Sequence, residues 1–245
     1  MPRFTRVFGR LFLIQAAWNY ERMQGVGFGY AAEPALRSLP GGAGGEAYRA
    51  ALARQSRFFN AHPYFAGLAV GAAVRGEFDG EPPERIARLR EALCGPLGSL
   101  GDRLFWASWL PTCSAIAVVL VVFGARVWAA LAFLALYNTV HLVCRVWALR
   151  AGWRHGMHVA SALSTPRLQA ATRVATPLVG LAVGVALPIA FGWQLHDASD
   201  VTTLAAAAGA VLFALVLRLA GGRTSGVVLA AVLLGATWLL GVLWP

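Results

Sequence analysis

Long apolar stretches fill the second half of this chain and leave it few ways to fold. Five of them approach the roughly 20 apolar residues that a membrane-spanning helix needs, at 104–124, 127–144, 174–195, 201–217 and 227–244. Only 13% of all residues are charged, against about 25% in an average soluble domain. We therefore predict an all-α integral membrane protein with about five transmembrane helices.

The links between these stretches differ in charge, which predicts an orientation. The link after the second stretch contains five arginines, at positions 145, 150, 154, 167 and 173. Arg218 and Arg223 lie in the link after the fourth, whereas the link after the third contains Asp197 and Asp200. Because cytoplasmic links are enriched in basic residues, we expect residues 1–103 on the cytoplasmic side and the C-terminus outside.

The formal charge of +10 raises the question of a nucleic-acid partner. The arginines do not form a basic stripe with interleaved aromatic residues on a soluble face, so no nucleic-acid partner is expected. Membrane topology and contact with anionic lipids explain these arginines better.

Residues 1–103 contain most of the acidic residues and no full span, so we predict a boundary between this region and a transmembrane block at 104–245. The first residues predict an amphipathic helix at the membrane interface. Its basic face has Arg3, Arg6 and Arg10, and its apolar face has Phe4, Phe8 and Leu11. Extending the apolar line leads to Gln15, Asn19 and Arg22, which predicts a helix whose buried face turns polar and packs on protein near a hydrated site.

Two further segments of this region suit a membrane-embedded site. Residues 63–74 are apolar but too short to cross a bilayer, so they are expected to be re-entrant and covered by protein. Gly95, Pro96, Gly98 and Gly101 are expected to break a helix where the transmembrane block begins. Discontinuous helices of this kind line substrate sites in many transporters.

Three motifs resemble one known family. They are "WNYERMQGVGF" at 18–28, "FFNAHPY" at 58–64 and "GPLGSLGDRLFW" at 95–106. In order and spacing they resemble the IID membrane component of mannose/fructose/sorbose sugar phosphotransferase systems, and the resemblance covers nearly the whole chain.

The resemblance implies a partnership and a mechanism. A IID subunit pairs with a IIC subunit in the bacterial inner membrane, the pairs assemble as a trimer, and an elevator-like movement carries a sugar across. Cytoplasmic IIA and IIB components relay phosphate, and IIB phosphorylates the sugar, so this chain is expected to be a transport subunit and not an enzyme. Phe78 and Arg103 depart from the family pattern and favour an alternative, a non-transporting structural or regulatory subunit.

A sugar site needs amides and carboxylates that bridge neighbouring hydroxyls. Asn60, Glu77 and Asp102 are the candidates for sugar binding. Each has a structural alternative: Asn60 could cap a helix ahead of Pro63, Asp102 could cap a helix that begins at Leu104, and Glu77 could pair with an arginine.

Other polar residues of the motifs predict an internal polar lattice near the pathway. Its expected members are Trp18, Asn19, Glu21, Arg22, Gln24 and His62. His155 and His158 lack nearby acidic or cysteine partners, so no metal is expected. No cofactor is expected either, because "GVGFGY" follows no strand.

Overall fold

The computed structural model describes residues 1–194, and all regular elements in this range are helices. In chain order they are α1 (Phe4–Leu11), α2 (Gly25–Leu36), η1 (Gly42–Gly44), α3 (Glu46–Gln55), α4 (Ala66–Phe78), α5 (Pro83–Gly101), η2 (Asp102–Trp109), α6 (Leu110–Val122), α7 (Val127–His155), η3 (Gly156–His158), α8 (Ala160–Leu163) and α9 (Pro166–Gln194). Met1–Ala190 form one compact unit, and the rest of α9 belongs to a second unit. The expected boundary at residue 103 concerns entry into the membrane and stays a prediction.

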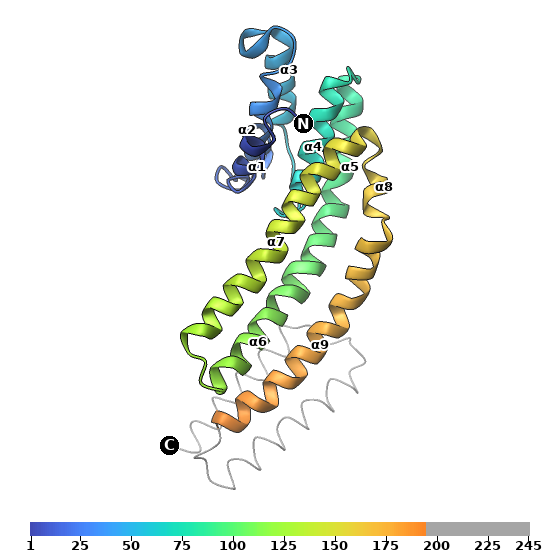
Figure 1. Ribbon diagram of the computed structural model, residues 1–245. Helices are drawn as coiled ribbons and strands as arrows, with labels where there is room; N and C mark the ends of the chain where they lie inside the picture. Colours follow the sequence, from blue (N-terminus) through green and yellow to red (C-terminus); the bar gives the residue numbers. More distant parts are fainter. Residues whose placement is uncertain (195–245) are drawn as a thin grey trace. The chain divides into compact units, whose positions relative to one another are not determined.

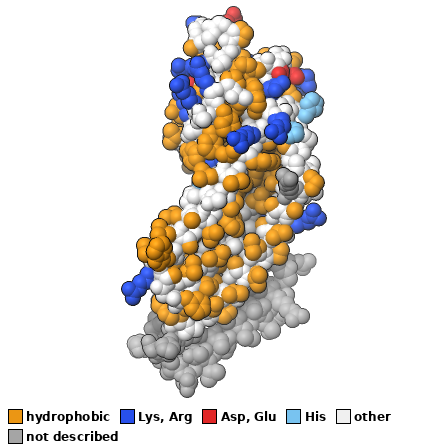
Figure 2. All heavy atoms as spheres, in the orientation of Figure 1, with side chains coloured by type: hydrophobic (Ala, Val, Ile, Leu, Met, Phe, Trp, Pro, Cys, Tyr) orange, Lys and Arg blue, Asp and Glu red, His pale blue; other side chains and the backbone are white. Residues whose placement is uncertain are grey.

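Three helical stretches within the described residues are long and apolar enough to cross a membrane, namely Pro83–Val122, Val127–His158 and Ala160–Trp193. They confirm the all-α membrane fold, and they overlap the first three expected spans. The expected spans at 201–217 and 227–244 lie outside the described residues. Figure 1 shows α6 and α7 as an antiparallel pair, and Figure 2 shows hydrophobic side chains over most of this face of the pair. Such a surface suits lipid or a membrane partner.

The expected helix break in the glycine-rich motif was wrong. Gly95, Pro96, Gly98 and Gly101 all lie within α5, and the helix continues through the wider π-helical turns of η2 into α6. The 40 residues of this helix measure about 60 Å at 1.5 Å per residue. That is roughly twice the hydrocarbon thickness of a bilayer. A continuous helix pairs its own backbone groups, whereas a break at membrane depth leaves them in need of other partners.

The predicted extension of the first helix was also wrong. α1 ends at Leu11, and a series of turns follows as far as Gln24. The side-chain oxygen of Asn19 accepts a hydrogen bond from the backbone N–H of Arg22 at 2.9 Å, as asparagine often does in turns. The two predicted faces are present in part. Leu11 is buried, Phe4 and Phe8 are partly buried, and Arg3 and Arg6 are exposed. Arg10 is partly buried and forms an ion pair with Glu33 at 2.7 Å.

The short apolar segment forms α4, which is too short to span a bilayer and is buried along its length from Ala66 to Val74. It packs mainly against α7, with α2, α5 and η3 as further neighbours. This agrees with a segment that is covered by protein, while a re-entrant position in the membrane stays a prediction.

Glycines let the backbones of α4 and α7 touch. A Cβ atom on Gly71 would lie 2.6 Å from the carbonyl oxygen of Leu149 and 2.6 Å from the backbone nitrogen of Trp153. A Cβ atom on Gly152 of α7 would overlap the carbonyl oxygen of Leu68 in α4. Close approach at small residues is a common way to pair helices in membranes.

We expect Gly71→Val to lower the free energy of unfolding by about 2 kcal/mol, because its side chain would push two rigid backbones apart. Thermal unfolding in detergent would measure the loss. Gly180→Val is the matched control, since a Cβ at Gly180 meets no atom of the described residues within 4 Å. Equal melting temperatures for the two variants would contradict the close packing of α4 on α7.

A buried arginine links the end of α1 to the packed helices α4 and α7. Arg145 of α7 donates from Nη1 to the carbonyl oxygen of Leu11 at 2.8 Å. Its guanidinium carbon also lies 4.8 Å from the ring centre of Phe12 and 4.9 Å from that of Tyr64. The carbonyl end of a helix and the faces of aromatic rings both stabilise a cation, so Arg145 joins three segments without a carboxylate within the described residues.

Candidate functional site

The three sequence motifs meet around one polar cavity of about 550 Å³. It is bounded by the turns before α2, the loop between α3 and α4, and one face of α5 and η2. The lining residues are Gln15, Gln24, Phe58, Asn60, Ala61, His62, Pro63, Cys94, Gly95, Gly98, Ser99, Asp102 and Trp106. Its volume falls in the range of small-molecule sites, which is about 300–1,000 Å³.

The first motif holds the second in place through Gln24, whose side chain is buried. Its amide nitrogen donates to the carbonyl oxygen of Ala61 at 2.7 Å, and its amide oxygen accepts from the backbone N–H of Ala61 at 3.4 Å. The backbone N–H of Gln24 also donates to the carbonyl oxygen of Phe59 at 2.8 Å. These bonds fix the backbone on both sides of Asn60.

The second motif packs on the third through His62. A Cβ on Gly101 would overlap the imidazole, so only glycine admits the ring at this position. The ring also stacks on Phe105, with 5.5 Å between ring centres. Its Nδ1 accepts a hydrogen bond from the backbone N–H of Tyr64 at 3.3 Å. Burial, helped by the positive charge of Arg145, lowers the pKa of His62 to about 4, so the ring is neutral at pH 7.

Arg90 of α5 fixes the start of the same loop. Its guanidinium donates to the carbonyl oxygens of Arg54 at 2.7 Å, Gln55 at 3.1 Å and Arg57 at 3.1 Å. Its carbon lies 4.5 Å from the ring centre of Phe28. This one side chain therefore binds the carbonyl end of α3 and the first residues of the loop that carries Asn60.

The remaining polar groups of the cavity are free to bind a ligand. The side chains of Gln15, Asn60 and Asp102 are exposed and form no hydrogen bond with the described residues. Phe58 and Trp106 add two half-exposed aromatic surfaces. Amides, one carboxylate and aromatic faces match the groups of a neutral polyol such as a sugar.

The structure excludes the helix-capping alternatives for two sugar-binding candidates, Asn60 and Asp102. Asn60 caps no helix, because α4 begins at Ala66 without a side-chain cap. Asp102 cannot cap a helix at Leu104, since it lies inside a continuous helix. Both structural alternatives are therefore wrong, and both side chains line the cavity.

Glu77 does not lie at the cavity, and the alternative of an arginine partner is the one that the structure shows. Its Oε2 accepts from Nη2 of Arg54 at 2.7 Å, and its Oε1 accepts from Nε of Arg54 at 2.9 Å. The amide nitrogen of Gln55 donates to Oε1 at 2.6 Å. Both carboxylate oxygens are thus used to join α4 to α3, so Glu77 has no free group for a sugar.

The expected polar lattice is smaller than predicted. Gln24 and His62 are buried and connect the motifs, and Asn19 stabilises a turn. Trp18, Glu21 and Arg22 are exposed and do not line the cavity, because the chain there forms turns and not a packed helix.

Ser99 and Trp106 line the cavity but were not predicted as site residues, although the sequence contains a signal for them. Gly95, Gly98, Ser99, Asp102 and Trp106 follow each other at helical spacings of three, one, three and four residues. On a continuous helix this spacing predicts a single face, but the glycines and Pro96 predict a break in the helix. Arg90 carried no signal at all, because its partners are backbone carbonyls 33 to 36 residues away.

The neutral state of His62 predicts an acid-sensitive fold. The usual histidine pKa of about 6.5 applies to the unfolded chain, while the folded value is about 4. The unfolded state therefore binds more protons between pH 6.5 and pH 4, and stability falls as the pH falls through this window. We expect His62 to lower the free energy of unfolding at pH 4.5 by on the order of 2 kcal/mol relative to pH 7. His62→Gln should remove it, and His158→Gln, an exposed control, should not; melting temperatures from pH 7 to pH 4.5 would test this.

No group of three potential metal ligands occurs among the residues that the structure describes.

Comparisons with known proteins agree with the motifs. Residues 2–191 match the family model described as "PTS system mannose/fructose/sorbose family IID component". The mannose-specific EIID component of Escherichia coli K12 is 32% identical over 186 residues, which cover 74% of this chain and 65% of that protein. The fructose permease IID component of Bacillus subtilis is 30% identical and covers 74% of this chain and 66% of its own length. The match thus spans slightly less than two thirds of these relatives.

Solved structures show the same fold. One is a chain of the cryo-EM structure of the mannose transporter ManYZ in complex with microcin E492, at a TM-score of 0.59 and 30% identity. The match covers 74% of this chain and 67% of that one. Another, described as a membrane protein, has a TM-score of 0.66 at 28% identity, over 73% of this chain and 67% of its own.

Proposed function

This chain belongs to the mannose/fructose/sorbose family of phosphotransferase-system IID components, and from this premise we propose that it forms, with a IIC subunit, the pathway by which a hexose crosses the membrane. The observation that carries the proposal is the meeting of three distant motifs around one polar cavity. Two of its polar side chains, Asn60 and Asp102, neither cap a helix nor form a hydrogen bond with the described residues.

In the proposed site Asp102 accepts hydrogen bonds from two neighbouring sugar hydroxyls, and the amide of Asn60 donates to or accepts from a third. The sugar ring packs against Phe58 or Trp106, which are half-exposed. Gly95 and Gly98 leave room for it, since a Cβ at either position would meet no atom of residues 1–194 within 4 Å. Glu77 contacts no sugar in this proposal.

The transport step requires other subunits. We infer that IID and IIC pair in the bacterial inner membrane, that the pairs form a trimer, and that the sugar-bearing part moves in an elevator-like manner. IIA and IIB carry the phosphoryl group, and IIB phosphorylates the arriving sugar. The hydrophobic surface of α6 and α7 in Figure 2 supports burial against lipid and IIC. Residues 1–103 face the cytoplasm in this arrangement, and the C-terminus lies outside.

A second candidate is a structural or regulatory subunit that holds IIC without transporting sugar. Arg103 favours it, because this exposed cation stands next to Asp102 in the sequence and departs from the family pattern. The two proposals differ in one measurable respect, which is sugar uptake.

The test is uptake of radiolabelled mannose, fructose, sorbose and amino sugars by cells that express this chain with IIC, IIA and IIB. Transport predicts saturable uptake of at least one sugar that disappears when this chain is omitted. A stable IIC–IID complex that takes up none of them would contradict the transport proposal and favour the regulatory one.

A further inference from the structure

A groove of about 660 Å³ runs along the second half of α7, beside α8 and the residues that lead into α9. One end is apolar and is lined by Leu142, Val143 and Val146. The other end is basic and is lined by Arg150, Arg154 and His155. The groove therefore changes from apolar to cationic over about three turns of one helix.

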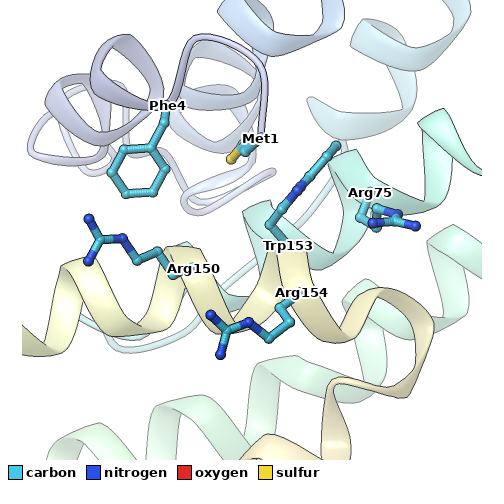
Figure 3. Close-up of a pocket in the computed structure, with 6 residues that line it drawn as sticks. All are labelled: Met1, Phe4, Arg75, Arg150, Trp153 and Arg154. Atoms are coloured by element: carbon cyan, nitrogen blue, oxygen red, sulfur yellow. The ribbon is translucent and has the colours of Figure 1, made fainter.

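The two arginines also border a second cavity of about 430 Å³ on the neighbouring side of α7, together with Phe4, Arg75 and Trp153. In Figure 3, Arg150 extends toward Phe4 and Arg154 points away from it. The guanidinium carbon of Arg150 lies 5.3 Å from the ring centre of Phe4. The α7 arginines thus provide positive charge to both cavities.

These cations are not neutralised within the described residues. Arg75 pairs with Asp79 at 2.7 Å, but neither Arg150 nor Arg154 forms an ion pair there. They are four residues apart on one helix face, so a rotation of the Arg150 side chain away from Phe4 would let both guanidinium groups reach one anion in the groove. A phosphate with several acceptor oxygens is the anion that two guanidinium groups bind best.

The position in a spanning helix specifies the ligand further. Both arginines lie in the last two turns of α7, within the candidate span Val127–His158. At such a helix end the basic side chains reach headgroup level, while the preceding apolar residues face acyl chains. A phosphorylated protein would use only the basic end of the groove, whereas an anionic phospholipid would fill both ends.

We propose that this groove is a binding site for an anionic phospholipid, with the phosphate between Arg150 and Arg154 and an acyl chain along Val143 and Val146. The site is separate from the sugar cavity, and no lining residue is shared between the two. It would anchor the end of α7 next to α1 and α4, which both contact that helix.

The test uses the purified, delipidated full-length chain in detergent. Native mass spectrometry would measure binding of phosphatidylglycerol and of phosphatidylcholine with the same acyl chains. We expect phosphatidylglycerol to bind at least tenfold more tightly. The double variant Arg150→Gln/Arg154→Gln should lose this preference, and Arg126→Gln, at the opposite end of α7, should keep it.

A further measurement on the wild-type protein makes the result independent of variant folding. Inorganic phosphate at millimolar concentration should not displace phosphatidylglycerol, because it lacks the acyl chain. Full displacement would overturn the proposal in favour of a free phosphate site. Equal binding of the two lipids would also overturn it, as would binding of phosphorylated IIB that requires both arginines while lipid binding does not.

Discussion

Replacing Asp102 with asparagine is expected to reduce sugar uptake by about 100-fold and to leave the fold unchanged. The carboxylate is exposed and has no partner among the described residues, so its loss removes no structural contact. A hydrogen bond to a charged group contributes about 1.5–3 kcal/mol, and each 1.4 kcal/mol is a factor of ten in affinity. Uptake of labelled sugar, measured together with the melting temperature of the IIC–IID complex, checks both parts of the expectation.

Two matched variants sharpen this test. Glu91→Gln removes an exposed acid from the same helix, outside the cavity, and should leave uptake unchanged. Gly98→Leu places a side chain in the cavity, where a Cβ has no neighbour within 4 Å, and should block uptake without destabilising α5. Normal uptake in both Asp102→Asn and Gly98→Leu would mean that this cavity does not bind the sugar.

The largest loss of stability is expected from Arg90→Gln, at about 3 kcal/mol. The substitution leaves three carbonyl oxygens of the α3 end and its loop without their shared cation, and unpaired buried polar groups cost about 1–3 kcal/mol each. Arg90→Lys should recover only part of the loss, because an ammonium cannot reproduce the planar fork of a guanidinium. Thermal unfolding in detergent, with limited proteolysis at the loop of residues 56–65, would measure it.

Arg88→Gln is the control for this variant, since Arg88 is an exposed arginine two residues away on the same helix. It should change the melting temperature by no more than a surface substitution does. If the Arg90→Gln and Arg88→Gln variants had the same melting temperature, Arg90 would not stabilise the loop as described.

The fold class could be predicted because it depends on local apolar length, which a sequence shows directly. The three described spans and the buried α4 follow from runs of apolar residues at 63–74 and beyond 104. The ends of helices were harder to predict. Gly95 to Gly101 stay helical although their composition predicts a break. Gly101 makes room for the ring of His62, and Gly95 and Gly98 line the cavity, and composition reveals neither role.

The candidate site was predicted in part. Asn60 and Asp102 were identified from their motifs, and both line the cavity. Glu77 was not distinguishable from them, because its partners Arg54 and Gln55 lie 22 to 23 residues earlier in the chain. Long-range contacts of this kind, like those of Arg90, depend on how α3, α4 and α5 pack and have no local pattern.

Cys94 allows a direct test of whether sugar binds in the cavity formed by the three motifs. It is a free, partly exposed thiol that lines this cavity, whereas Cys113 is buried and Cys144 lines a separate apolar cavity. The measurement is the rate of maleimide labelling at each cysteine of the IIC–IID complex, followed by mass spectrometry, with and without saturating sugar. We expect a transported hexose to slow labelling of Cys94 severalfold and to leave the labelling rate of Cys144 unchanged. An unchanged Cys94 rate with a sugar that the complex demonstrably transports would contradict sugar binding in this cavity.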